Sequence, residues 1–415
     1  MTHSRNYRTL RRLILPALAG SVLAALAFAP TFGAEQVQAN VPAQSISAPK
    51  VDMPKTDVPR PDDVKTGEIN EPAPHKEANP SAFTGTAVIS ESKTFEHQRF
   101  DNTISDQNSF IGKNKATITI DSSVFDKTGN TSNDDNSNFR GQNAVVLSIE
   151  GSQTSIKNSN ITSSSIGSNA VFATEGAHSA TLATDRGEGT ITAEAAKLTT
   201  SGEGSPVIYS TGNIIVNNVN GIANNSEIGV VEGKNSITLT NSNVTGYKDN
   251  GFMLYQSFSG DAESGIARLK AENNTLTTHA TGAFLYVNNT TAEVDLSNNA
   301  ISMPNTSTLV KASADSRWGK TGENGGHLTL RTSNQELSGN IMADSISTIA
   351  LDMTNGSSLV GAVNTDNTAK EVTVKLSKDS NWILTGDSYV KSLSNEDTTG
   401  SNIQLNGYKL VVADK

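Results

Sequence analysis

Apolar and polar residues alternate in short runs along most of the chain, and clusters of Asn, Gly and Ser separate the runs. Three runs share one template, in which two apolar residues flank a polar one and two asparagines follow within a few residues. These runs are Ile237-Thr238-Leu239, Ala267-Arg268-Leu269 and Val294-Asp295-Leu296. Alternation with a period of two is typical of a strand with one buried face. We therefore expect Leu269 to face inward between Leu239 and Leu296, and Arg268 to face solvent.

The spacing of equivalent runs predicts a solenoid. The steps between marker residues are 30, 27, 34, 21 and 23 residues, lengths that suit one coil each. The markers are Leu239, Leu269, Leu296, Leu330, Leu351 and Val374. At about 27 residues per coil, the body from Phe83 to Lys415 would form roughly 12 coils. Asparagine tolerates the left-handed backbone of tight turns, so asparagines that recur at one coil position would stack into a side-chain ladder.

A second column of apolar runs follows the first strand of each coil. Its members are Val171-Phe172, Val207-Ile208-Tyr209, Val230-Val231, Met253-Leu254-Tyr255, Phe284-Leu285-Tyr286 and Leu309-Val310. Two columns in phase predict at least two stacked sheets. Five aromatic residues of this column are expected to stack in the core rather than to form a binding platform: Phe172, Tyr209, Tyr255, Phe284 and Tyr286. No helical period of useful length occurs in the body.

Composition supports an all-β body and narrows the chemistry. About 168 of the 415 residues are Ser, Thr, Asn or Gly, and only 5% are aromatic, so the core must consist of many small aliphatic contacts. The net charge of −10 argues against nucleic-acid binding, because phosphate contacts require a clustered basic surface. The chain has no cysteine, which excludes disulfides, thiolate metal sites and cysteine nucleophiles.

The first part of the chain has the character of an export signal followed by a linker. Four arginines precede the apolar run 13–30, as in a secretory signal peptide, and a cut after Ala39 fits the preference for small residues. No later run is long enough to span a bilayer. The predicted segments are a signal peptide over 1–39, a Pro-rich disordered linker over 40–82, a β-helical solenoid over 83–380 and a closing segment over 381–415.

The coil pattern resembles autotransporter passenger domains, the secreted bacterial adhesins built as a right-handed parallel β-helix. The segment from Trp382 to Val390, with Leu393, Asn395 and the run 403–407 after it, looks like the part that closes such passengers. The resemblance implies a right-handed parallel β-helix and a translocator β-barrel. Since no barrel sequence follows Lys415 in this chain, we expect that a separate outer-membrane translocator supplies it, that it has been lost, or that this is another kind of secreted β-helix protein.

Motifs for catalysis, metal and nucleotide binding are weak. The run 319–321 resembles the end of a phosphate loop but lacks its first glycine. The acidic run 133–136 is interpreted as a solvated turn, and no histidine pair has metal-ligand spacing. Asp295 is an outward carboxylate whose equivalents in earlier coils are expected to be Arg268 and Thr238, which indicates a surface charge pair. We therefore expect no cofactor and no catalytic residue.

Two insertions are the candidate recognition elements. The longer one, 311–326, lies in the largest coil step, and the shorter one, 256–265, leaves the same column two coils earlier. Insertions at one corner of a solenoid usually share a face. The candidate contact residues are Asp315, Arg317, Trp318, Lys320 and Glu323 of the longer insertion and Phe258 of the shorter one. The alternative for Trp318 is that it covers core beneath its own loop.

These patterns favour a secreted or surface-exposed, adhesin-like β-helix protein without enzymatic activity. Its expected partner is a protein or glycan on a host or bacterial surface, with no role for nucleic acid and no membrane-spanning segment in the mature chain. Two alternatives remain open: a polysaccharide lyase or hydrolase on the same scaffold, and a soluble effector that engages a host receptor. Carboxylates grouped on one sheet face would favour the enzyme.

Overall fold

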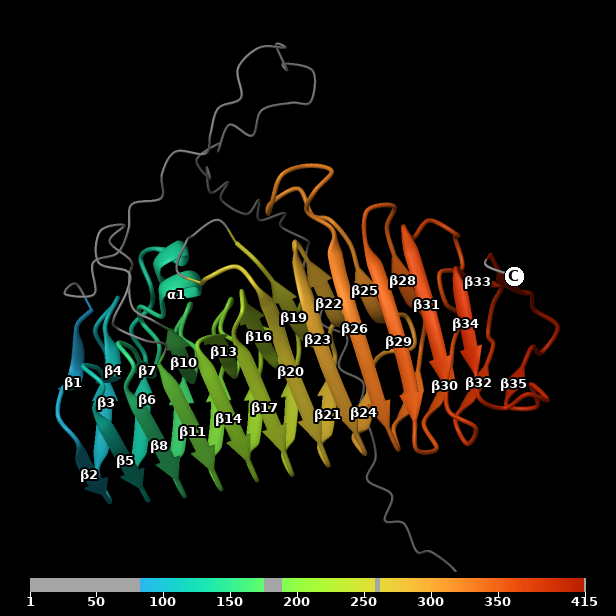
Figure 1. The fold of residues 1–415 in the computed structure, drawn as a ribbon. Helices are drawn as coiled ribbons and strands as arrows, with labels where there is room; N and C mark the ends of the chain where they lie inside the picture. The colour runs from blue at the N-terminus through green and yellow to red at the C-terminus, as the bar shows by residue number, and fades with distance from the viewer. Residues whose placement is uncertain (1–82, 175–188, 258–261, 414–415) are drawn as a thin grey trace, which may run out of the picture. The chain divides into compact units, whose positions relative to one another are not determined.

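The computed structural model describes residues 83–174, 189–257 and 262–413. Within these residues the chain forms a right-handed parallel β-helix, in which successive coils stack their strands in parallel (Figure 1), so the predicted fold class is confirmed. The predicted signal peptide and linker (1–82) and Phe258 lie outside the described residues.

The coils build three long sheets and two short ones. Sheet A contains β1 (Gly85–Ile89), β4 (Asn108–Gly112), β7 (Val146–Ser148), β10 (Val171–Thr174), β13 (Ile208–Thr211), β16 (Gly229–Glu232), β19 (Phe252–Tyr255), β22 (Ala283–Asn288), β25 (Thr308–Ala312) and β28 (Ile341–Ala343). Sheet B contains β2 (Lys93–Glu96), β5 (Thr117–Asp121), β8 (Gln153–Lys157), β11 (Thr190–Glu194), β14 (Asn213–Asn217), β17 (Ser236–Thr240), β20 (Ile266–Glu272), β23 (Thr290–Ser297), β26 (Gly326–Ser333), β29 (Thr348–Thr354), β31 (Glu371–Leu376) and β34 (Ser392–Asn395).

Sheet C and its continuation complete each coil. Sheet C contains β3 (Arg99–Asn102), β6 (Val124–Lys127), β9 (Asn160–Ser163), β12 (Lys197–Thr200), β15 (Asn220–Ala223), β18 (Asn243–Gly246), β21 (Thr275–Thr278) and β24 (Ala300–Ser302). Sheet D contains β27 (Glu336–Ser338), β30 (Ser358–Val360), β32 (Asn381–Ile383) and β35 (Ile403–Gln404), and sheet E pairs β33 (Ser388–Val390) with β36 (Leu410–Val412). As far as β30 each coil passes through A, B and then C or D, whereas β31 and β34 extend sheet B without a strand of sheet A before them. The twelve strands of sheet B agree with the expected number of coils.

The predicted inward and outward faces are correct, but the predicted register is not. Leu269 is buried, yet it pairs with Ile237 and Val294 rather than with the expected Leu239 and Leu296. The shift of two residues arises because the turn after the strand sets the register: Asn241 and Asn273, each the first residue of that turn, lie at equivalent positions. A shift of two leaves every side chain on the same face of the sheet.

The turns between sheets B and C contain the expected asparagine ladder. In ten consecutive coils the residue directly after the sheet B strand has a positive φ, and in seven of these coils it is an asparagine. In several of these coils the next residue is polar, points inward and bonds to the neighbouring coil. Asn274 Nδ2 donates to Asn299 Oδ1 at 2.8 Å, and Asn299 Nδ2 donates to Gln335 Oε1 at 3.0 Å. These buried amides are satisfied by one another, which avoids the cost of unpaired polar groups.

Sheet A is buried on both faces from β4 to β22. Its inner face joins the interior core with residues such as Phe252 and Phe284, while its outer face forms a second hydrophobic cluster. This outer cluster contains Ile111, Leu147, Phe172, Tyr209, Val230, Met253, Tyr255 and Tyr286. The prediction that the five aromatic residues share one core is therefore wrong: only Phe284 lies inside, and the other four lie in the outer cluster. Apolar runs without alternation are typical of strands with two buried faces.

A short helix and a loop cover part of this outer face. Helix α1 (Asp134–Arg140) precedes β7, and its N-cap Asn133 accepts a hydrogen bond from the Asn136 amide at 2.9 Å. The acidic run is solvent-exposed, as predicted, but it is the N-cap and first turn of a helix, where carboxylates interact favourably with the positive end of the dipole. Gly141 ends α1 with φ +73°, and a Cβ there would lie 2.7 Å from Leu147 and 2.8 Å from Phe172.

The longer insertion is smaller than predicted. Residues 311 and 312 belong to β25 and residue 326 begins β26, so the loop itself spans 313–325. Both this loop and the segment between β19 and β20 follow a strand of sheet A and precede one of sheet B, which confirms that they leave from one corner. Toward the C-terminus, Trp382 is fully buried, and its Nε1 donates to Gly361 O at 3.0 Å.

Candidate functional site

A groove of about 410 Å³ lies on the outer face of sheet A. Its floor consists of the outward side chains Tyr209 on β13, Val230 on β16, and Met253 and Tyr255 on β19. Three consecutive coils therefore contribute to one surface, because parallel pairing places their outward residues in adjacent rows. The volume lies within the range of small-ligand pockets, which are commonly apolar with a few polar groups at fixed positions.

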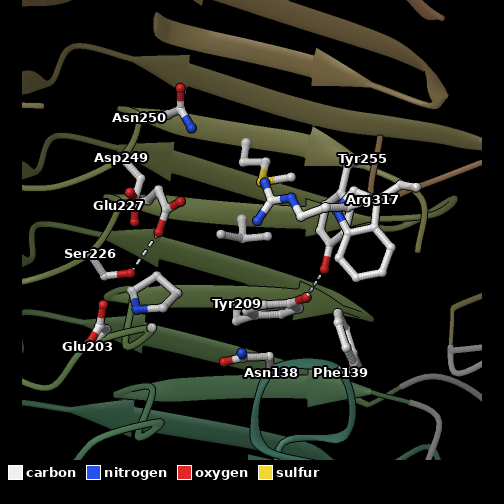
Figure 2. Close-up of a pocket in the computed structure, with 15 residues that line it drawn as sticks. Asn138, Phe139, Glu203, Tyr209, Ser226, Glu227, Asp249, Asn250, Tyr255 and Arg317 are labelled. Carbon is white, nitrogen blue, oxygen red and sulfur yellow. Dashed lines mark hydrogen bonds between the residues drawn. The ribbon is translucent and has the colours of Figure 1, made fainter. Parts of the chain in front are cut away.

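The first wall is formed by three consecutive turns between sheets C and A, residues 201–207, 224–228 and 247–251. These turns carry Glu203, Glu227 and Asp249, which lie along one side of the groove (Figure 2). Backbone hydrogen bonds join the second and third turns, from Ile228 N to Gly251 O at 2.9 Å and from Tyr247 N to Ser226 O at 3.1 Å. The wall is therefore part of the stacked coil structure.

The opposite wall is formed by α1 and the loop 313–325. Trp318 packs edge-to-face on Phe139 of α1, with ring centroids 5.4 Å apart, and lies 5.7 Å from the ring of Tyr255. The loop thus reaches back along sheet A to a helix that precedes it by many coils. Asn324 Nδ2 holds the loop in shape by donating to the carbonyl oxygens of Asp315 and Trp318, both at 2.7 Å.

Arg317 extends from this second wall across the floor toward Glu227 (Figure 2). Its backbone N–H donates to Asp315 Oδ1 at 2.7 Å, and its Nε lies 3.3 Å from the same oxygen. Burial raises the pKa of Asp315, but the hydrogen bonds and charge of Arg317 outweigh burial and hold that pKa below its usual range. Asp315 therefore stays ionised and orients Arg317 rather than facing the groove itself.

Glu227 is a buried carboxyl group at the edge of the groove. Burial raises its pKa to about 7; the Ser226 hydroxyl, which donates to Oε2 at 2.6 Å, lowers it, and the nearby Asp249 carboxylate raises it further. The charge of Arg317 lowers it by a smaller amount. Asp249 is exposed and lies on the next coil with φ +64°. Two neighbouring carboxyl groups thus occupy unlike environments.

Glu203 is the exposed carboxylate of the same wall. It forms an ion pair with Lys248 at 2.8 Å, and the hydrogen bond and charge of Lys248 lower the pKa of Glu203. This pair joins the first turn of the wall to the third. Exposed ion pairs contribute little to stability, so its effect is to set the charge at the rim of the groove.

A second buried carboxyl group, Glu232, lies beside the floor, at the end of β16 and aligned with Tyr255 of β19. Its Oε2 accepts hydrogen bonds from the Tyr209 hydroxyl at 3.0 Å and the Tyr255 hydroxyl at 3.2 Å, and its Oε1 accepts one from Ser257 N at 3.1 Å. Burial raises the pKa of Glu232, and these hydrogen bonds oppose the shift. The two tyrosine hydroxyls are also 2.6 Å apart. This network fixes the two phenol rings that form the floor.

The structure brings together only some of the predicted contact residues. Arg317 and Trp318 line the groove, and Asp315 supports Arg317. Lys320 and Glu323 form an exposed ion pair with each other at 2.6 Å and do not line the groove. Trp318 is half-buried and covers the outer cluster, whereas the alternative interpretation had placed it over the core beneath its own loop.

Sequence reasoning missed the acidic wall and the aromatic floor of the groove. The missed residues are Phe139, Glu203, Tyr209, Glu227, Asp249, Met253 and Tyr255. The sequence did contain one signal. Glu203, Glu227 and Asp249 each lie a few residues before an apolar run of the second column. Equivalent positions in successive coils stack, so these turns could have been aligned on one wall.

The outer face of sheet B carries a different set of charges. Arg331 lies 3.3 Å from Asp295, and Arg268 lies 3.5 Å from Glu293, so the predicted surface charge pairing is confirmed. The partner positions were wrong, because Asp295 is aligned with Lys270 and Arg331 and not with Arg268. All these side chains are at least partly exposed, in contrast with Glu227.

Within the described ranges, no group of three or more His, Asp or Glu side chains is placed to hold a metal ion. No helix of this part of the chain has the length and apolar character that crossing a membrane requires. Comparisons of the chain with protein-family models, with curated proteins and with solved structures found no match. The assignment of function therefore depends on the groove.

Proposed function

We propose that this protein is a secreted or surface-exposed, adhesin-like β-helix that binds a surface glycan in the groove of sheet A. The observation that carries the proposal is the combination of an aromatic floor with polar rims. Trp318 offers an apolar ring surface for the C–H face of a sugar ring, and the largely buried rings of Tyr209 and Tyr255 line the floor beside it. Asn250, Asp249 and Arg317 offer donors and acceptors for sugar hydroxyls.

The position of the groove also suits attachment. A rod of stacked coils is rigid, and a site on its side is held by many strands rather than by one loop. The resemblance to autotransporter passengers supports placement at the cell surface, with a separate outer-membrane translocator as the proposed partner. Fractionation of producing cells, with detection of the chain in envelope and supernatant, tests this placement. A chain found entirely in the cytoplasm contradicts it, and one found only in the supernatant favours a soluble effector.

Binding of the full chain to an array of immobilised oligosaccharides tests the glycan proposal. We expect Trp318→Ala to weaken binding about thirtyfold or more, a loss of ~2 kcal/mol, because it removes a ring from the groove. Arg317→Gln should also weaken binding, because it removes the guanidinium group that faces the groove while no ring is lost. The matched control is Lys320→Ala, which lies on the same loop outside the groove and should bind as the parent does. Equal losses in all three variants would contradict binding in the groove.

A further inference from the structure

Glu227 differs from the other buried glutamate in a way that points to a reaction. Glu232 accepts hydrogen bonds from two tyrosine hydroxyls and a backbone amide, is fully buried and does not line the groove. Glu227 is only 9% exposed, has the Ser226 hydroxyl as its side-chain hydrogen-bond donor, and lines the groove. Burial of a carboxyl group with so little compensation is costly. A role in the groove accounts for a residue that the packing alone does not require.

The neighbouring carboxyl group completes a pair. Asp249 lies on the next coil, and its side chain lies beside Glu227 on the same wall (Figure 2). Burial and the charge of Asp249 raise the pKa of Glu227 to about 7, so Glu227 is protonated below that pH. Asp249 is exposed to solvent. This is the division between acid and base that such pairs require.

We propose that Glu227 and Asp249 hydrolyse a glycosidic bond of the glycan that the groove binds. This inference rests on the proposed glycan binding. The Glu227 carboxyl donates its proton to the glycosidic oxygen as the bond from that oxygen to the anomeric carbon breaks. A water molecule attacks the anomeric carbon, and the Asp249 carboxylate accepts the proton that the water loses. The products are two shorter glycans, and proton exchange with solvent restores both carboxyl groups.

Other groove residues position the substrate for this step. Tyr209 and Tyr255 are held by hydrogen bonds to Glu232, so the largely buried floor of the groove is fixed. Arg317 reaches over the floor toward Glu227, where its guanidinium can hold a sugar hydroxyl or carboxylate next to the acid. Asp315 holds Arg317 in that direction. The substrate class is therefore an oligosaccharide or polysaccharide with at least two sugar units over the floor.

The test uses the full chain and hexasaccharides of N-acetylglucosamine, glucose, xylose, mannose and galacturonic acid, each labelled at the reducing end. Binding is measured by fluorescence anisotropy. Cleavage in water enriched in ¹⁸O is measured by chromatography of the labelled fragment and mass spectrometry of the unlabelled one. We expect the parent to cleave at least one of the hexasaccharides that it binds and to place ¹⁸O at the new reducing end. Glu227→Gln should lower the rate at least a hundredfold, while its affinity stays within threefold of the parent.

The controls separate this inference from the proposed function. Glu293→Gln, on the outer face of sheet B, should cleave at the parent's rate. The pH profile of the parent should fall on the alkaline side near pH 7, as Glu227 loses its proton. Binding without cleavage overturns the hydrolysis and leaves a glycan-binding groove; absence of binding to all five hexasaccharides overturns both. An unsaturated product without ¹⁸O, or a Glu227→Gln variant as active as the parent, also overturns the hydrolysis.

Discussion

The outer faces of sheets A and B belong to the same coils but have opposite character. On sheet B most outward residues are polar or charged, and they remain at least partly exposed, as Thr238 and Arg268 do. On sheet A the corresponding outward row consists of Phe172, Tyr209 and Val230, all buried. The interior of the coil is equally apolar behind both sheets. The difference between the two sheets therefore lies in the elements that cover the outer face of sheet A.

The covering elements come from insertions at the two corners of sheet A. Helix α1 enters from the corner with sheet C, and the loop 313–325 enters from the corner with sheet B. They meet where Phe139 contacts Trp318. Since neither insertion alters the pairing of the flanking strands, a regular solenoid can gain a groove without changing its core. The comparison leads to four predictions about stability, in order of decreasing expected effect.

Replacement of Phe172 tests the buried outer face of sheet A. Its ring is fully buried and stacks on Tyr209 at 4.6 Å, so Phe172→Ala should cost ~3 to 5 kcal/mol of unfolding free energy. The matched control is Ile215→Ala on the outer face of sheet B, where Ile215 is 43% exposed; it should cost under ~1 kcal/mol. Urea denaturation followed by circular dichroism measures both. Similar losses would mean that the two faces do not differ.

Replacement of adjacent residues tests the two sides of sheet B. Leu269→Ala should cost ~2 to 5 kcal/mol because it leaves a cavity between Ile237 and Val294. Arg268→Ala should cost under ~1 kcal/mol, since its ion pair with Glu293 is exposed. The measurement is again urea denaturation. A larger loss for Arg268→Ala would show that the inward and outward faces are reversed.

The pH dependence of stability tests the burial of Glu227. Its pKa is about 7 in the folded protein and 4.5 ordinarily, so the folded state binds this proton more tightly. The stabilisation is complete below pH 4.5 and is lost as the pH rises through 7, a change of ~3 kcal/mol. Glu227→Gln should remove this dependence when unfolding is measured at pH 5 and pH 8. The control Glu203→Gln should retain it, because the lowered pKa of Glu203 acts below that window.

Removal of one hydroxyl from the network of Tyr209, Tyr255 and Glu232 should have the smallest effect on stability. Tyr209→Phe removes a donor to Glu232 and a contact with the Tyr255 hydroxyl, but it keeps the ring, so we expect a loss of ~1 to 2 kcal/mol. Tyr247→Phe is the control, since Tyr247 is 46% exposed outside the groove floor; it should change stability by less than ~0.5 kcal/mol. Thermal melts suffice. No loss for Tyr209→Phe would show that Glu232 does not depend on this donor.

The sequence predicted the features that repeat from coil to coil. Alternation placed Leu269 inside and Arg268 outside, and recurrent asparagines such as Asn273 and Asn298 marked the turns. The register failed by two residues because Ala271, a small apolar residue, occupies the position that larger residues occupy in neighbouring coils. A period of two cannot detect such a shift, since it keeps each residue on its own face. The positions of the turn asparagines do reveal the shift of two residues.

The groove could be predicted only in part, because its residues come from separated segments. Arg317 and Trp318 were recognisable as a charged, aromatic insertion. Glu227 and Asp249 carry no local motif, and their proximity depends on the stacking of two turns in adjacent coils. The direction of the loop 313–325 follows from the contact of Trp318 with Phe139, a pairing that spacing in the sequence does not indicate.

The amide ladder of Asn274, Asn299 and Gln335 also has a kinetic consequence. Each folded coil leaves an amide group at its open end that the next coil must satisfy, and the matching partner exists in only one alignment. A partly folded stack therefore acts as a template for the next coil. Folding by nucleation at one place and growth along the axis follows naturally for such nearest-neighbour contacts. The ladder makes a misaligned coil costly at the moment of its addition, before the loops that form the groove have closed.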